Sequence, residues 1–205
     1  MGYNVIHMIE AADWLEELEY FRLVEQCRQT YRFLAETDRC TEQVCMIFSD
    51  KVKTIKTEPG SWPGETAFRR PKNRKKIEHE KQRVCFEEAL YEAAEHMNVG
   101  GEWIIILYTG GAVRRSKRTM IGKWKKALKV RPTLLAIQSD QADTVFLESY
   151  TEEAHIFSVE EQGCLIQWLE KYGKNPEETV GKTTKNQKSA EKSEELWKII
   201  RDCFV

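Results

Sequence analysis

Two blocks of basic residues are the part of the sequence best suited to bind a charged partner. Residues 69–83 include eight Lys or Arg and two Glu, and residues 114–131 include nine Lys or Arg and no acidic residue. Their net charges of +6 and +9 contrast with a net charge of −1 for the whole chain of 205 residues. Exposed helices usually mix both signs of charge, so this segregation favours an anionic partner.

We therefore predict an anion-binding surface and leave open whether it meets nucleic acid or an acidic protein. Long cationic side chains would bind phosphates or carboxylates, and Trp62 and Phe68 would be available to stack on bases. The alternative is that both blocks are ordinary solvated charge. The residues expected at the surface are Arg69, Arg70, Lys72, Arg74, Lys75, Lys76, Arg114, Arg115, Lys117 and Arg118.

Candidate acid–base residues are few. Glu10, Asp13 and Asp50 lie at or just beyond apolar runs, where strand ends could bring two carboxylates into one site. Asp13 is better explained as a helix cap and Asp50 as a turn residue. His7 lies inside an apolar run and is expected to be a core histidine with satisfied hydrogen bonds. The glycine-rich nucleotide-binding motifs and the Gly-x-Ser-x-Gly motif are absent, so we predict no catalytic residue and no cofactor.

The six cysteines contain no Cys-x-x-Cys pair, which favours free thiols in a reducing compartment. Cys40 and Cys45 could hold zinc only with two further ligands, which no histidine supplies at a recognisable spacing. We therefore predict no zinc site. Thr109-Gly110-Gly111 is interpreted as a tight turn, with an anion-binding loop as the alternative.

Alternating strand and helix patterns predict the fold. Short apolar runs predict buried strands at 5–9, 44–48, 103–108, 134–137 and 155–157, and residues 51–57 predict an edge strand that folds back. Ser158 and Glu161 have the spacing of a capping box that opens a final helix. Two earlier helices have predicted inner faces: Trp14, Leu18, Phe21, Val24, Cys27, Tyr31 and Leu34, then Phe86, Ala89, Leu90, Ala93 and Met97.

A change in composition divides the chain after residue 173. Residues 1–173 are predicted to form one α/β domain, whereas residues 174–192 are polar and are predicted to be a flexible linker. Residues 193–205 regain an amphipathic helical pattern, with Trp197, Ile200 and Phe204 as the expected contacts for a partner helix. Packing of this helix on its own domain is the alternative.

Three passages of the sequence carry a resemblance to a known family: residues 5–13, residues 43–55, and residues 101–111 with the following helix and the 134–140 strand. In element order the chain resembles the von Willebrand factor A family over residues 3–173. The resemblance implies a three-layer α/β fold. Its sheet would be mostly parallel and Rossmann-like, with one antiparallel edge strand.

The resemblance also implies where a divalent metal would bind in the family. Metal-binding members use an Asp-x-Ser-x-Ser motif after the first strand, a Thr in a later loop and an Asp after the central strand. Here Glu10 stands for the first Asp, while Ala12 and Trp14 replace the serines. Gly110 replaces the later Asp, and Thr66 is a badly spaced candidate for the Thr. With these oxygen ligands missing, we predict a metal-free relative.

Intracellular members of this family mostly serve as interaction modules in multiprotein assemblies. The resemblance and the basic blocks together predict a non-catalytic scaffold in the cytoplasm or nucleus, whose strand-end loops present a basic surface to an anionic protein partner. Direct nucleic-acid binding is the alternative, and an unrecognised α/β enzyme is the third. No apolar run reaches the roughly 20 residues of a membrane helix, so no membrane partner is predicted.

Overall fold

The computed structural model describes residues 2–12, 15–37, 40–55, 60–70, 86–97, 101–110, 132–139 and 155–172. The chain divides into two compact units, Met1–Trp168 and Leu169–Val205, and the fold below is that of the first. Among the described helices, none is long and apolar enough to cross a membrane. The predicted linker 174–192 and terminal helix 193–205, with Trp197, Ile200 and Phe204, lie outside the described residues.

A six-stranded sheet has the strand order β3-β2-β1-β4-β5-β6. Neighbouring strands are parallel except for β2 and β3, which are antiparallel and make β3 an edge strand. The predicted fold class is confirmed, and each predicted strand is present. The strands are β1 (Tyr3–Glu10), β2 (Cys40–Phe48), β3 (Val52–Ile55), β4 (Glu102–Thr109), β5 (Thr133–Gln138) and β6 (Ile156–Ser158).

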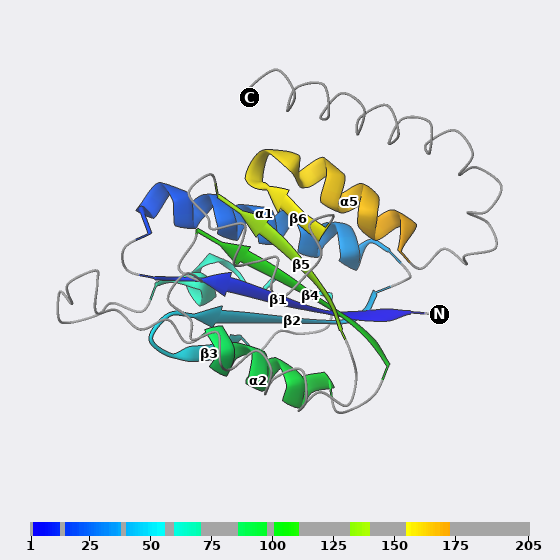
Figure 1. Ribbon diagram of the computed structural model, residues 1–205, viewed down its shortest axis with the longest axis horizontal. Coiled ribbons are helices and arrows are strands. Elements are labelled where there is room, and N and C mark those ends of the chain that lie inside the picture. The colour runs from blue at the N-terminus through cyan, green and yellow to red at the C-terminus, as the bar shows by residue number, and fades with distance from the viewer. Residues whose placement is uncertain are drawn as a thin grey trace, which may run out of the picture. The chain divides into compact units, whose positions relative to one another are not determined.

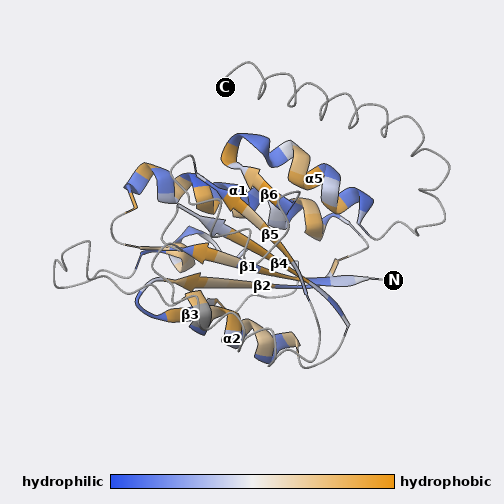
Figure 2. Ribbon diagram, viewed as in Figure 1, coloured by the Kyte–Doolittle hydropathy of each residue, from blue (hydrophilic) through white to orange (hydrophobic). Residues whose placement is uncertain are grey.

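The central strands are mostly apolar because helices cover both faces of the sheet, although β1 also contains the buried polar residues His7 and Glu10. Figure 1 shows α1 (Glu17–Ala35) on one face and α2 (Phe86–Met97) on the other. Nearly every residue of β1 and β4 is buried, and Figure 2 shows apolar residues concentrated along the central strands. Strands buried on both faces form continuous apolar runs, which is why the sequence reveals them.

Helix α2 packs on the sheet as its sequence predicts. All five residues of its expected inner face are buried. They belong to one apolar core with side chains from four strands, among them Ile6, Met46, Ile105 and Leu134. The helical period of three to four residues therefore identifies the buried face of α2 correctly.

Helix α1 differs from its prediction in the first half. Leu18 and Phe21 were expected to face the core, but they are 64% and 58% exposed, and Tyr20 and Leu23 are buried instead. The ring of Tyr20 can be buried because its hydroxyl donates to the carbonyl oxygen of Phe68 at 2.6 Å. The predicted cap is wrong as well. The residue preceding the helix is Glu16, which makes no side-chain capping hydrogen bond.

Helix α5 (Gln162–Lys171) follows a short 3₁₀ helix, η6 (Val159–Glu161). The backbone N–H of Ser158 donates to Glu161 Oε2 at 2.9 Å, so the predicted capping box is confirmed. The side chain of Gln162 donates to the carbonyl oxygen of Gln26 in α1 at 3.3 Å. The start of α5 therefore lies on the α1 face of the sheet, and the unit has three layers.

Candidate functional site

The carboxyl ends of β1 and β4 meet where the strand order reverses. The chain passes from β1 outward to β2 and β3, then returns through β4 on the other side of β1. In open α/β sheets a ligand usually binds in the crevice at such a point. Glu10 ends β1 there, and Thr109 and Gly110 stand at the end of β4.

Glu10 joins these two strand ends. Its side chain is fully buried, and its Oε2 accepts hydrogen bonds from Thr109 Oγ1 at 2.6 Å and from Gly110 N at 3.1 Å. Hydrogen bonds to a carboxylate are among the stronger ones in proteins. The position that the family resemblance assigns to a metal ligand is therefore occupied by a carboxylate that ties β1 to β4.

The space beside Gly110 is filled by Leu15. A Cβ atom at position 110 would lie 2.0 Å from Leu15 Cδ1, so a larger residue would displace this buried leucine. Ala12 is buried and offers no side-chain oxygen, and Thr66 is exposed on η1 (Glu65–Phe68). Within the part of the chain that the structure describes, no group of His, Cys, Asp or Glu could hold a metal ion. The donor set for the family's divalent metal does not fit here.

We expect the purified protein to contain no stoichiometric metal and to melt at the same temperature with and without Mg²⁺. Leu15 occupies the place that a second carboxylate would need, so an added ion finds no set of oxygen ligands. Elemental analysis and thermal melts measure this. A ligand present at 100 times its Kd stabilises by about 2.7 kcal/mol, so a rise of several degrees with Mg²⁺ would reveal an ion site.

A second group of polar side chains surrounds His7 on the α1 face of the sheet. His7 Nε2 lies 2.9 Å from Gln43 Oε1, and His7 Nδ1 lies 3.0 Å from the Tyr108 hydroxyl. Gln43 Nε2 donates to the carbonyl oxygen of Tyr31 at 3.1 Å, which leaves Gln43 Oε1 as the acceptor for His7. His7 is thus a neutral ring that donates from Nε2 and accepts from Tyr108. The prediction of a satisfied core histidine is confirmed.

Burial controls the ionisation of this cluster. Desolvation lowers the pKa of His7 to about 4, whereas the hydrogen bond with Gln43 acts in the opposite direction. Burial also raises the pKa of the Cys27 thiol, beside Cys45, and the pKa of the Tyr108 hydroxyl, both well above their ordinary values. A neutral imidazole, thiol and phenol without solvent access offer a substrate no general base or nucleophile. The cysteines in the described segments are free, as predicted.

A groove of about 630 Å³ lies between α1 and residues 60–70, and we call it the α1 groove. Residues 60–70 form one wall of the groove and are held to α1 by three hydrogen bonds. The Tyr20 hydroxyl donates to the Phe68 carbonyl at 2.6 Å, and the Tyr31 hydroxyl donates to the Ser61 carbonyl at 3.0 Å. The Arg70 guanidinium donates to the Glu16 carbonyl at 2.9 Å. The lining residues are Glu17, Tyr20, Phe21, Val24, Glu25, Arg28, Trp62, Glu65, Phe68, Arg69 and Arg70.

Two of the predicted anion-binding residues are described, and both line the α1 groove. Arg69 is exposed. Arg70 is half-buried, and its guanidinium carbon lies 4.6 Å from the centroid of the Tyr20 ring. The others lie outside the described residues: Lys72, Arg74, Lys75, Lys76, Arg114, Arg115, Lys117 and Arg118.

The rings of Trp62 and Phe68 pack against each other, and this leaves Phe68 unable to stack on a base. Their rings stack on each other, with centroids 4.5 Å apart and planes inclined by 10°, and Phe68 is buried. Trp62 also meets the ring of Tyr31, at 5.4 Å. A segment of turns and one short 3₁₀ helix needs apolar contacts of its own to lie on α1, and these two rings provide them. The predicted stacking role is therefore wrong for Phe68.

The α1 groove itself was not predicted. The aromatic pair Tyr20-Phe21 is its signal in the sequence, because two adjacent helical residues cannot both face the sheet. Periodicity assigns Phe21 to the core, so the sequence alone does not reveal that its ring is exposed at the groove.

Strand order, the antiparallel β3 and the flanking helices define a von Willebrand factor A-like fold. The chain is similar to a von Willebrand factor type A structure from Catenulispora acidiphila, with a TM-score of 0.61 and 7% identity over 82% of this chain and 42% of the other. Proximal thread matrix protein 1 from the mussel byssus matches with a TM-score of 0.55 and 14% identity, over 82% of this chain and 46% of the other.

A second structure of the mussel protein is described as having a zinc-occupied MIDAS motif. The hypothetical protein BatB from Bacteroides thetaiotaomicron matches with a TM-score of 0.53 and 13% identity, over 83% of this chain and 98% of the other. The chain spans less than half of the length of the mussel and Catenulispora chains. No protein-family model and no curated protein matches the sequence.

Proposed function

We propose that the chain is a non-catalytic interaction module that binds an acidic protein partner inside the cell through the α1 groove and the basic residues around it. The observation that carries the proposal is Phe21, whose aromatic side chain is 58% exposed and lines the same groove as Arg69. Aromatic residues and Arg are enriched at the centres of protein interfaces, where a few of them supply most of the binding energy.

The lining of the α1 groove contains three Glu and three Arg, so its formal charge is zero, and the case for an acidic partner rests on the basic segment that Arg69 begins. Arg28 is already paired with Glu25 at 2.7 Å, whereas Arg69 is exposed and begins a segment of net charge +6. The basic residues from Lys72 to Lys76 and from Arg114 to Arg118 are the part of the proposal that rests on sequence alone. Electrostatic attraction of this kind speeds encounter and selects the partner more than it adds affinity.

The candidate acid–base residues support a non-catalytic role. The Glu10 carboxylate accepts hydrogen bonds from the end of β4, and His7 is neutral and buried. Asp50 accepts a hydrogen bond from the Ser49 hydroxyl at 3.0 Å in the turn between β2 and β3. Asp13 lies outside the described residues. Each described carboxylate or imidazole of the expected set therefore has a structural role.

Fluorescence anisotropy with a labelled peptide rich in Glu and Phe tests the proposal. The double variant Phe21→Ala with Arg69→Gln should bind about tenfold more weakly, because losing an interface hot spot costs more than about 1 kcal/mol. Lys51→Gln is the control, since Lys51 is an exposed cation in the β2–β3 turn. Equal affinities for wild type and both variants would contradict the proposal.

Direct nucleic-acid binding is the second candidate because of the two basic blocks. A random single-stranded oligonucleotide is the probe, titrated at several salt concentrations. Replacing Arg114, Arg115, Lys117 and Arg118 with Gln should then flatten the log–log salt slope by about one unit for each phosphate that is no longer bound. Tight oligonucleotide binding without any binding of the acidic peptide would favour this function over the first.

A further inference from the structure

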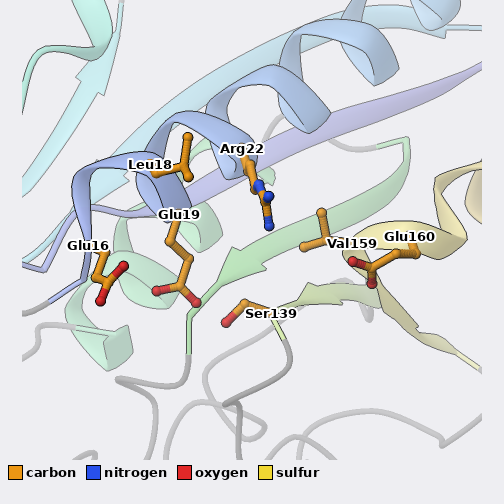
Figure 3. A pocket seen from close by; sticks show the side chains of 7 residues that line it. All are labelled: Glu16, Leu18, Glu19, Arg22, Ser139, Val159 and Glu160. Atoms are coloured by element: carbon orange, nitrogen blue, oxygen red, sulfur yellow. The ribbon is translucent and has the colours of Figure 1, made fainter.

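A second cavity, of about 190 Å³, shares no lining residue with the α1 groove. Its walls come from the start of α1, from the residue after β5 and from η6, as Figure 3 shows. We call it the strand-end cavity. Its polar lining residues are Glu16, Glu19, Arg22, Ser139 and Glu160.

Ser139 is the residue that indicates a ligand. The residue is 7% exposed, and its hydroxyl oxygen is buried without a hydrogen-bond partner in the described structure. The backbone N–H of Ser139 donates to the Thr109 carbonyl at 3.0 Å, which fixes its position. Figure 3 shows the hydroxyl turned into the cavity on the side of Glu19. A buried hydroxyl without a partner costs about 1–3 kcal/mol, which a bound donor would remove.

The charged lining favours a cation. Three carboxylates, from Glu16, Glu19 and Glu160, accompany one guanidinium from Arg22, a formal net charge of −2. Figure 3 shows Glu19 and Glu160 on opposite sides of the cavity with Ser139 between them. These carboxylates are not among any described group able to hold a metal ion. We therefore consider an organic cation whose N–H groups can donate hydrogen bonds to these acceptors.

The size and apolar walls of the cavity suit a single side chain. Pockets for drug-sized ligands measure about 300–1,000 Å³, well above this volume. Leu18 and Val159 also line the cavity and can contact an aliphatic stem. An ammonium group at the end of such a stem has three N–H donors. These match three acceptors: the Glu19 carboxylate, the Glu160 carboxylate and the Ser139 hydroxyl.

We propose that the strand-end cavity binds the side chain of a lysine from a protein partner. The ammonium group donates to Glu19, Glu160 and Ser139, and Arg22 is left to bind a backbone carbonyl beside that lysine. The inference rests on the proposed function only in taking the partner to be a protein. It uses none of the residues of the α1 groove.

An NMR titration of ¹⁵N-labelled protein tests the inference. The probes are a blocked Gly-Lys-Gly peptide, n-butylammonium as the same side chain without a peptide, and a blocked Gly-norleucine-Gly peptide as the uncharged control. Saturable shifts of the Ser139 and Glu160 amides are expected with the lysine peptide and with n-butylammonium. The norleucine peptide should cause none.

Matched variants separate binding in the cavity from surface charge. Glu19→Gln and Ser139→Ala should each weaken lysine-peptide binding about tenfold, since a hydrogen bond to a charged group contributes about 1.5–3 kcal/mol. Glu36→Gln makes the same change of charge on an exposed residue just after α1 that lines neither the strand-end cavity nor the α1 groove. Its affinity should stay within about twofold of wild type. Ser139→Ala should also keep or raise Tm, whereas a structural role for the hydroxyl would lower it.

Three outcomes would overturn the inference. The first is an absence of saturable shifts, and the second is an equal loss of affinity in Glu36→Gln and Glu19→Gln. The third is binding of n-butylammonium without binding of the lysine peptide, which would identify a free alkylamine as the ligand. Failure of the variant Phe21→Ala with Arg69→Gln to weaken acidic-peptide binding bears on the proposed function alone, because neither residue lines this cavity.

Discussion

The protein with Ile105→Asp should fail to fold, because Ile105 is fully buried in β4, inside the sheet. It lies in register with Ile6 of β1 and Leu134 of β5, within the apolar core that α2 covers. Placing an unpaired carboxylate there costs several kcal/mol. That loss is comparable to the whole stability of a typical domain, about 5–15 kcal/mol.

Circular dichroism and thermal melts measure this effect. Ile105→Val is the control at the same site, since it removes one methyl group and costs about 0.5–1.5 kcal/mol. The control should stay folded and melt a few degrees lower. A soluble Ile105→Asp protein with a cooperative melt would show that β4 is not part of the core.

Stability should fall as the pH is lowered from about 6.5 to about 4, and His7 should account for a large part of the change. Burial lowers the pKa of His7 to about 4 in the folded protein, whereas an exposed histidine titrates near 6.5. Between these values the unfolded chain binds a proton that the folded chain does not, so folding weakens as the pH falls. This difference between the folded and unfolded pKa values corresponds to about 3 kcal/mol of folding stability, which is fully present above pH 6.5 and is lost as the pH falls to about 4.

Urea titrations from pH 4 to pH 7 on wild type and on His7→Asn test this expectation. The Asn side chain can still accept from the Tyr108 hydroxyl but cannot titrate. Its protein should be less stable at neutral pH, because the hydrogen bond to Gln43 is lost. The slope of unfolding free energy against pH should decrease by up to about 1.4 kcal/mol per pH unit, which corresponds to one proton. Parallel curves for the two proteins would mean that His7 is not buried as a neutral ring.

The strands and helix α2 could be predicted because the local pattern of apolar residues along the sequence shows which of their residues are buried. Ile104 to Leu107 is apolar without interruption, and the inner face of α2 repeats with the helical period. The order of the strands could not be predicted in this way. The place of β4 beside β1 depends on pairing between segments that are distant in the sequence. The local pattern of apolar residues does not show which segments pair.

The candidate sites were less accessible to sequence reasoning. Glu10 and Gly110 were located through the family resemblance, but the packing of Leu15 on Gly110 brings together residues far apart in the chain. Helix α1 has two neighbouring apolar stripes at its start, one with Leu18 and Phe21 and one with Tyr20 and Leu23. The second stripe is the buried one, and Tyr20 in it donates a hydrogen bond to the Phe68 carbonyl. No pattern in the sequence singles out Ser139. It became a candidate only because the structure shows its buried hydroxyl oxygen without a hydrogen-bond partner.

The outer strands of the described sheet are also its shortest. Strand β3 has four residues and β6 has three, and the exposed Lys53 lies within β3. A polypeptide that joined the sheet by adding a strand would gain few backbone hydrogen bonds along either of these strands, and the charge of Lys53 opposes such pairing. Edge-to-edge aggregation is discouraged for the same reason. We therefore expect recognition by this domain to depend on side chains of its helices and loops rather than on strand addition.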